Sequence, residues 1–281
     1  MKKSALVLIS VVVFCLVAGT ADIPQHLRLY DINRGREISL GEAIPALKQN
    51  QIILIGEHHD NKKHHAAQLI IIRALKESGA RVAVGLEMFR SDSQQALDRW
   101  VAGKMDASEF KKIYFDNWSY PWSDYGMIFD YAREAKIPLI GLNVPMEIPR
   151  QVAQQGFQSL DEAQREKLSN ITCRVDQAYM NYIKKAFGAH AHGDLNFTYF
   201  CEAQLVWDNV MAINTLDYLD KNPEALVVVL TGTGHARKDA IPQQIRKRSQ
   251  VAYAVILPEV IGSIGPGTVD KQDADYLILD I

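Results

Sequence analysis

The sequence predicts an α/β fold in which a mainly parallel sheet is flanked by helices and carries an inserted, all-helical second domain. Short runs of β-branched and leucine residues recur along the chain, for example at 52–55 and 226–230, and such runs are typical of strands buried on both faces. Helical patterns alternate with these runs through most of the chain, as in parallel α/β proteins. No strand pattern occurs between residues 145 and 222, so the second domain is predicted to be helical.

Length and composition are those of a globular protein. The chain has 281 residues, of which 48% are hydrophobic and 23% are charged, and this is enough for a sizeable core. Its formal net charge is −2, and it has no basic arm or patch. Nucleic acid is therefore not an expected partner.

Residues 1–21 have the pattern of a signal peptide. Two lysines form a positive start, an apolar stretch covers 5–18, and small residues at 19–21 offer a cleavage site. We therefore expect an exported protein, in the periplasm or at the periplasmic face of the outer membrane. A lipid-attachment cysteine normally follows a small residue, whereas Phe14 precedes Cys15, so a lipid anchor is not favoured.

The patterns in residues 22–146 predict three strands and five helices. The predicted strands span 52–55, 81–86 and 137–142, and the predicted helices span 39–49, 63–78, 92–101, a stretch that begins after Asp106, and 125–135. Ser39 is a candidate N-cap, and Gly79 stands where a helix commonly ends. An aromatic segment at 118–125 either walls an apolar pocket or packs in the core.

The remaining patterns complete the two domains. Helices are predicted at 161–169, 172–187, 197–220 and 240–248, and strands at 226–230, 251–256 and 276–279. The α/β domain therefore comprises 22–146 and 223–281, and the helical domain comprises 147–222. Cys173 and Cys201 lie in the helical domain, where a disulfide in an oxidising compartment and two buried free thiols remain as alternatives.

Acidic and imidazole side chains follow three of the predicted strands. Glu57 and His59 come after the first strand, Glu87 after the second and His235 after the strand at 226–230. If these strands are neighbours, the four groups converge at one edge of the sheet, where ligands of open α/β sheets bind. Two kinds of catalysis fit this set of side chains. The alternative to both is that these side chains have no catalytic role and only cap helices or contact solvent. Glu57, His59 and His235 could bind a divalent metal of the zinc type, or a His–Glu pair could act as general base and orienter without a metal.

The helical domain contains residue types that bind haem. A haem needs a flat apolar slot and an axial ligand such as His, Tyr, Met or Cys. Candidates are Tyr179, Met180, His190, His192 and Tyr199. Packing of the tyrosines and Met180 in an ordinary helical core is the alternative.

Five stretches of the chain are similar to one known family. They are LIGEHHDNKKHHAAQ at 54–68, GLEMF at 85–89, GLNVP at 141–145, FCEAQLVWDNVMA at 200–212 and VVVLTGTGHA at 227–236. In this order they resemble the ChaN-like haem-binding lipoproteins of the Tiki/TraB/erythromycin-esterase superfamily. The resemblance covers nearly the whole mature chain.

The resemblance implies haem binding in iron uptake at a bacterial cell envelope, rather than catalysis. It implies a tyrosine as the haem ligand and homodimers with haems stacked between subunits, and it suggests periplasmic or outer-membrane haem-uptake proteins as partners. In the hydrolytic branches, the positions of Glu57, His59, Glu87 and His235 carry metal or general-base chemistry. A peptidase or esterase is therefore the alternative function.

Overall fold

The computed structural model describes residues 27–168, 171, 173–187 and 196–279. In this part of the chain, eight strands form a single sheet in the order β2-β1-β8-β7-β3-β6-β4-β5. The strands are β1 (Arg28–Asp31), β2 (Arg36–Ser39), β3 (Ile52–Glu57), β4 (Val82–Arg90), β5 (Leu139–Asn143), β6 (Leu226–Gly232), β7 (Tyr253–Pro258) and β8 (Tyr276–Ile278). All neighbours from β8 to β5 are parallel, whereas β1 is antiparallel to both of its neighbours. The predicted α/β fold with a mainly parallel sheet is therefore confirmed.

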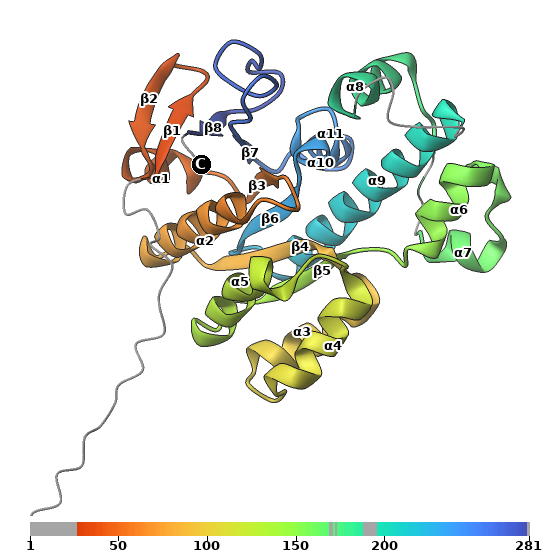
Figure 1. Cartoon of the computed structure of the whole chain (residues 1–281), viewed down its shortest axis with the longest axis horizontal. Coiled ribbons are helices and arrows are strands. Elements are labelled where there is room, and N and C mark those ends of the chain that lie inside the picture. Colours follow the sequence, from red (N-terminus) through yellow and green to blue (C-terminus); the bar gives the residue numbers. More distant parts are fainter. Residues whose placement is uncertain (1–26, 169–170, 172, 188–195, 280–281) are drawn as a thin grey trace, which may run out of the picture.

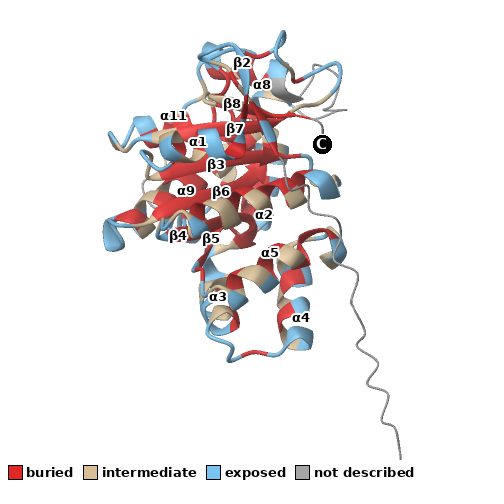
Figure 2. Ribbon diagram, turned by 90° about the vertical axis from the view of Figure 1, so that its left-hand side faces the viewer, coloured by how far each residue is buried: buried red, intermediate tan, exposed pale blue. Residues whose placement is uncertain are grey.

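Helices cover both faces of this sheet (Figure 1). One face packs against α1 (Leu40–Leu47), α2 (Lys62–Glu77), α3 (Gln94–Val101), α4 (Ala107–Asn117) and α5 (Trp122–Glu134). The other face packs against α9 (Phe197–Lys221), α10 (Thr233–Ala236) and α11 (Ile241–Arg246). Figure 2 shows the central strands buried between these two layers, as their uninterrupted apolar sequences require.

The helical segment packs around the first half of α9. Helices α6 (Glu147–Gln155) and α7 (Glu162–Glu166) lie on one side of α9, and α8 (Gln177–Phe187) packs through Tyr179, Tyr182 and Ile183 against Cys201 and Leu205. The second half of α9 joins the core of the sheet layer through Met211 and Ala212. The helical segment is thus fastened to the α/β layers by one continuous helix.

Local signals explain several helix boundaries. Ser39 and Glu42 form a capping box at the start of α1, and the Asn61 side chain accepts a hydrogen bond from the Lys63 amide at the start of α2. The predicted signal peptide and the candidate haem ligands His190 and His192 lie outside the described residues. No helix in the described ranges is both long and apolar enough to span a membrane.

The two cysteines of the helical segment are free thiols in the structure. Burial raises the pKa of Cys173 to about 12 and the pKa of Cys201 to about 11. Both groups are therefore protonated at neutral pH, and the disulfide alternative is not the state of this structure.

Candidate functional site

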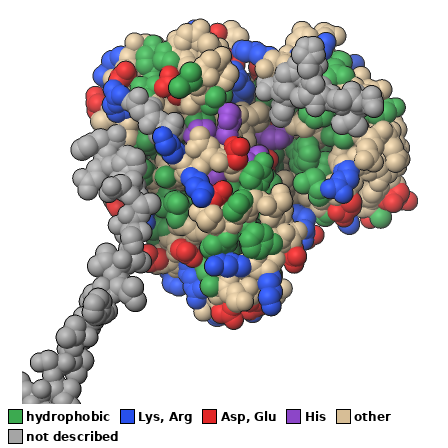
Figure 3. Space-filling view, viewed as in Figure 1, with side chains coloured by type: hydrophobic (Ala, Val, Ile, Leu, Met, Phe, Trp, Pro, Cys, Tyr) green, Lys and Arg blue, Asp and Glu red, His purple; other side chains and the backbone are tan. Residues whose placement is uncertain are grey.

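The strand order brings the carboxyl ends of β3, β6 and β4 together. Strand β6 lies between the other two, with Glu57 paired to Gly232 and Leu86 paired to Leu230. As a result Glu57, His59, Glu87 and His235 meet at one edge of the sheet, as their positions after the strands predict. Figure 3 shows histidine side chains gathered in a hollow on this face of the molecule.

Glu57 is the buried anchor of the site. Its Oε1 atom is 2.8 Å from His59 Nδ1, and its Oε2 atom accepts a hydrogen bond of 2.8 Å from Gln68 Nε2. The Tyr125 hydroxyl also donates to Oε1. Burial opposes ionisation of this carboxyl, yet the His59 and His65 imidazoles hold the pKa of Glu57 well below its usual range. Glu57 is therefore a carboxylate that orients His59.

His59 joins the two carboxylates of the site. Its Nε2 atom lies 4.0 Å from Glu87 Oε1, and its ring contacts Trp118 and Tyr120 with centroid separations of 5.0 and 5.4 Å. Burial alone would lower the pKa of His59, but the hydrogen bond to Glu57 and the charge of Glu87 raise that pKa to about 9. His59 is therefore an imidazolium at neutral pH.

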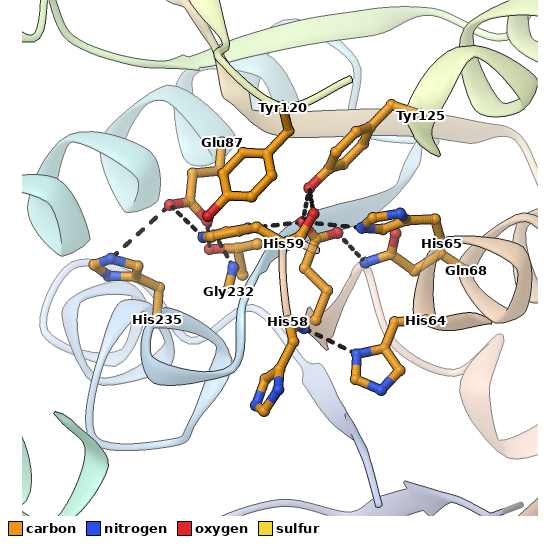
Figure 4. Close-up of polar contacts among 12 residues, drawn as sticks. His58, His59, His64, His65, Gln68, Glu87, Tyr120, Tyr125, Gly232 and His235 are labelled. Carbon is orange, nitrogen blue, oxygen red and sulfur yellow. Dashed lines mark hydrogen bonds and ion pairs between the residues drawn. The ribbon is translucent and has the colours of Figure 1, made fainter. Parts of the chain in front are cut away.

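Glu87 presents one oxygen to two imidazoles (Figure 4). Its Oε2 atom accepts hydrogen bonds from Thr231 Oγ1 at 2.6 Å and from the Gly232 amide at 2.7 Å. Its Oε1 atom lies 4.0 Å from Nε2 of both His59 and His235. A Cβ atom at Gly232 would come within 3.1 Å of His59 Nε2, so glycine leaves the space that this imidazole occupies.

His235 has a separate carboxylate partner from α9. Asp208 Oδ1 is 2.7 Å from His235 Nδ1, and Asp208 Oδ2 accepts a hydrogen bond of 2.5 Å from the Tyr179 hydroxyl. Burial raises the pKa of Asp208. Burial opposes the charged form of His235, but Asp208 nevertheless raises its pKa. Both imidazoles therefore have an Nδ1 partner that fixes the ring and leaves Nε2 directed toward Glu87.

The candidate haem ligands of the helical segment occupy different environments. Tyr179 is buried, and its hydroxyl is engaged by Asp208; burial and this carboxylate hold the pKa of Tyr179 well above its ordinary value. Met180 is partly buried against the cluster between α8 and α9. Tyr199 lies in the first turn of α9 with its ring against the backbone of Gly156. None of these three is among the groups that surround Glu87.

The predicted metal ligands do not form a coordination shell. Across the described ranges, no three His, Cys, Asp or Glu side chains are placed to hold one metal ion. Glu57 faces Nδ1 of His59, whereas His235 faces Glu87 from the opposite side. The arrangement is a chain of acid–imidazole contacts, which suits orientation of the rings and proton transfer along the chain.

Several site residues were not predicted from the sequence. Tyr125, Gln68, Asp208 and Thr231 hold the carboxylates and imidazoles in place, and Tyr120 covers His59. The sequence feature that could have identified two of them is a polar residue on an apolar helix face. Gln68 interrupts such a face of α2, and Asp208 interrupts one of α9.

Fold and site together define an α/β protein with a polar and aromatic crevice at the carboxyl edge of its sheet. The model of the family "Haem-binding uptake, Tiki superfamily, ChaN" matches residues 43–245, so the chain belongs to this family.

The comparisons with individual proteins agree with the fold. The structure of ChaN from Campylobacter jejuni with cofacial haem is 21% identical and superposes with a TM-score of 0.70, over 90% of this chain and 96% of that chain. The type III effector HopBA1 is 15% identical, with a TM-score of 0.51 over 84% and 89% of the two chains. Protein RETICULATA-RELATED 5, chloroplastic, of Arabidopsis thaliana is 24% identical over 82% of this chain and 35% of its own length. This chain thus spans about a third of the plant relative.

Proposed function

We propose that this protein binds ferric haem in the crevice beside Glu87 and holds or passes it during iron uptake at a bacterial cell envelope. The observation that carries the proposal is the convergence of two oriented imidazoles and several aromatic side chains at one edge of the sheet. The chain also belongs to a haem-binding uptake family. Trp118 and Tyr120 lie beside His59, and Trp207 lies beside His235 at a centroid separation of 6.0 Å.

The side chains around the crevice fit the needs of a haem. Aromatic rings supply flat apolar surface, and imidazole and phenol groups are axial ligands or hydrogen-bond donors for haem. The Tyr120 hydroxyl has no hydrogen-bond partner among the residues described, whereas the Tyr179 hydroxyl is held by Asp208. We therefore assign Tyr120 as the phenol that would hold the iron, with His59 and His235 as its neighbours. Bound haem would supply a ferric iron that a phenolate oxygen can ligate.

We propose further that a second copy of the chain closes the crevice. The protein from Campylobacter jejuni holds cofacial haems. Phe115 and Met146 are large apolar side chains with 54% and 44% of their surface exposed. Phe115 lies in the last turn of α4 just before Trp118, and Met146 follows β5, so both belong to segments that border the site. Burial of these side chains would favour a haem-linked dimer.

The test is a titration of the full chain, freed of haem, with ferric haem under absorption spectroscopy. We expect a Soret shift that saturates at a fixed haem-to-protein ratio, and mass measurement should show dimer formation on loading. Iron-free protoporphyrin is the matched control, and we expect weaker binding because it lacks the metal. A Soret signal that grows without saturation would refute haem binding.

The acid–imidazole chain also supports a second candidate function, a His/Glu-assisted hydrolase for esters or peptides. Glu57 orients His59 as a carboxylate orients a catalytic imidazole in such enzymes, and His59, protonated at neutral pH, would serve there as a general acid. A screen of ester and peptide substrates, with metal analysis of chelator-free protein, tests this candidate. Turnover that disappears in a His59→Gln variant would support it, and absence of turnover in every substrate would reject it.

A further inference from the structure

A cavity of about 650 Å³ lies outside the crevice, where the segment before α8 meets α9 and α11. Figure 1 shows α11 beside α9, with α8 above them. The cavity is lined by Arg174, Asp176, Leu205, Asn209, Gln244, Lys247 and Arg248. None of the residues that surround Glu87 belongs to this lining.

The cavity carries an excess of positive charge. Arg174, Lys247 and Arg248 contribute three cations, against one carboxylate from Asp176. That carboxylate accepts a hydrogen bond of 2.8 Å from the Tyr179 amide at the start of α8. Among the described residues, the ion pairs do not involve Arg174, Lys247 or Arg248. The positive charge is therefore not neutralised by the fold itself.

Arg248 is held in place as a fixed donor. Its Nη1 atom donates to the Gln244 carbonyl at 2.9 Å, and its Nη2 atom donates to Asn209 Oδ1 at 2.5 Å. Gln244 and Asn209 are each 2% exposed, so these contacts anchor the guanidinium to a buried floor. A guanidinium has five N–H donors, and the remaining ones are free for a ligand. Burial lowers the pKa of Arg248, which an anion beside it would offset.

We propose that this cavity binds a small organic anion that carries at least two oxyanion groups, either carboxylate or phosphate. A fixed arginine with two flexible cations matches the planar, bidentate geometry of these groups. The volume falls in the range of pockets for small organic ligands and exceeds what a single inorganic anion fills. Leu205 offers an apolar contact for the carbon skeleton of the ligand.

Isothermal titration calorimetry with citrate and, separately, pyrophosphate tests this site on the full chain, freed of haem and at near-physiological salt. We expect saturable binding of at least one probe, and the preferred probe distinguishes a carboxylate ligand from a phosphate ligand. Arg248→Gln and Lys247→Gln should each weaken binding by about tenfold or more. Arg150→Gln on α6 is the matched control, because Arg150 is exposed and lies outside the cavity, and it should bind as the parent does.

Three results would overturn the proposal. The first is absence of saturable binding of both probes. The second is an Arg248→Gln variant that retains the parent thermal unfolding curve and binds the probes equally well. The third is loss of anion binding when the crevice is loaded with haem, because this would make the cavity part of the haem site. Undiminished binding in the haem-loaded protein would confirm two separate sites.

Discussion

At the scale of single residues, the charge of His59 depends on two carboxylates of different character. Glu57 is buried and touches Nδ1 directly, whereas Glu87 acts on Nε2 from 4.0 Å. Together they outweigh the cost of burial and raise the pKa of His59 to about 9. An imidazolium between two carboxylates keeps the site from carrying a large negative charge.

The pH dependence of stability follows from this pKa. Because the folded-state pKa of His59 is raised from 6.5 to about 9, its stabilising effect is complete below pH 6.5 and is lost as pH rises through 9. The shift corresponds to at most about 3 kcal/mol of the free energy of unfolding. Urea denaturation of the haem-free protein between these pH values measures the loss.

The loss of unfolding free energy between pH 6.5 and 9 should largely disappear in a His59→Gln variant. His58→Gln is the matched control, since His58 is the exposed neighbouring imidazole. If both variants lose the same amount of unfolding free energy as pH rises, His59 is not the source of the pH dependence.

Residue patterns predicted part of the site. Glu57, His59 and Glu87 follow apolar runs directly, so strand signals placed them at one sheet edge. Asp208 and Tyr125 lie in the middle and first turn of helices, and their inward direction depends on how those helices pack. No local pattern encodes that packing.

At the scale of elements, long apolar or periodic segments were predictable and short ones were not. Strands β3 and β6 have uninterrupted apolar cores, whereas β1 and β2 have four residues each and depend on pairing with neighbours. Helix α6 was not predicted, because Pro149 lies in its first turn and Gly156 ends it after nine residues. Tertiary contacts with α9 stabilise it.

Gly156 gives an element-scale prediction. Its φ of +82° and ψ of 161° lie in a region that only glycine adopts readily, and a Cβ atom there would come within 2.7 Å of the Tyr199 ring. We expect Gly156→Ala to lower the free energy of unfolding by about 2–3 kcal/mol.

Gly79→Ala separates backbone strain from the ring clash. Gly79 also has a positive φ, of +86°, but nothing lies within 4 Å of a Cβ atom there. Chemical denaturation should therefore show a smaller loss of unfolding free energy for Gly79→Ala than for Gly156→Ala. Equal losses would mean that contact with Tyr199 contributes nothing.

At the scale of the whole molecule, strand order makes the site. Strand β6 follows the helical segment in sequence, yet it inserts between β3 and β4. This insertion places His235 beside Glu87 and brings α9, with Asp208, over the same edge. A sequence pattern predicts that these strands exist but not their order, because pairing partners are distant along the chain.

The crevice proposed for haem lies at the sheet edge, whereas Tyr179, Met180 and Tyr199, considered from the sequence, lie in the helical segment. Tyr120 comes from the connection between α4 and α5, and His59 and His235 come from strand ends. The placement of haem among these three side chains is the central claim of the account.

The most direct measurement of that claim is the absorption spectrum of the ferric-haem complex in Tyr120→Phe and Tyr199→Phe variants. We expect Tyr120→Phe to lose the phenolate-to-iron charge-transfer band and to bind haem more weakly, while Tyr199→Phe retains the parent spectrum. A Tyr120→Phe spectrum that matches the parent, with the band lost in Tyr199→Phe instead, would contradict the account.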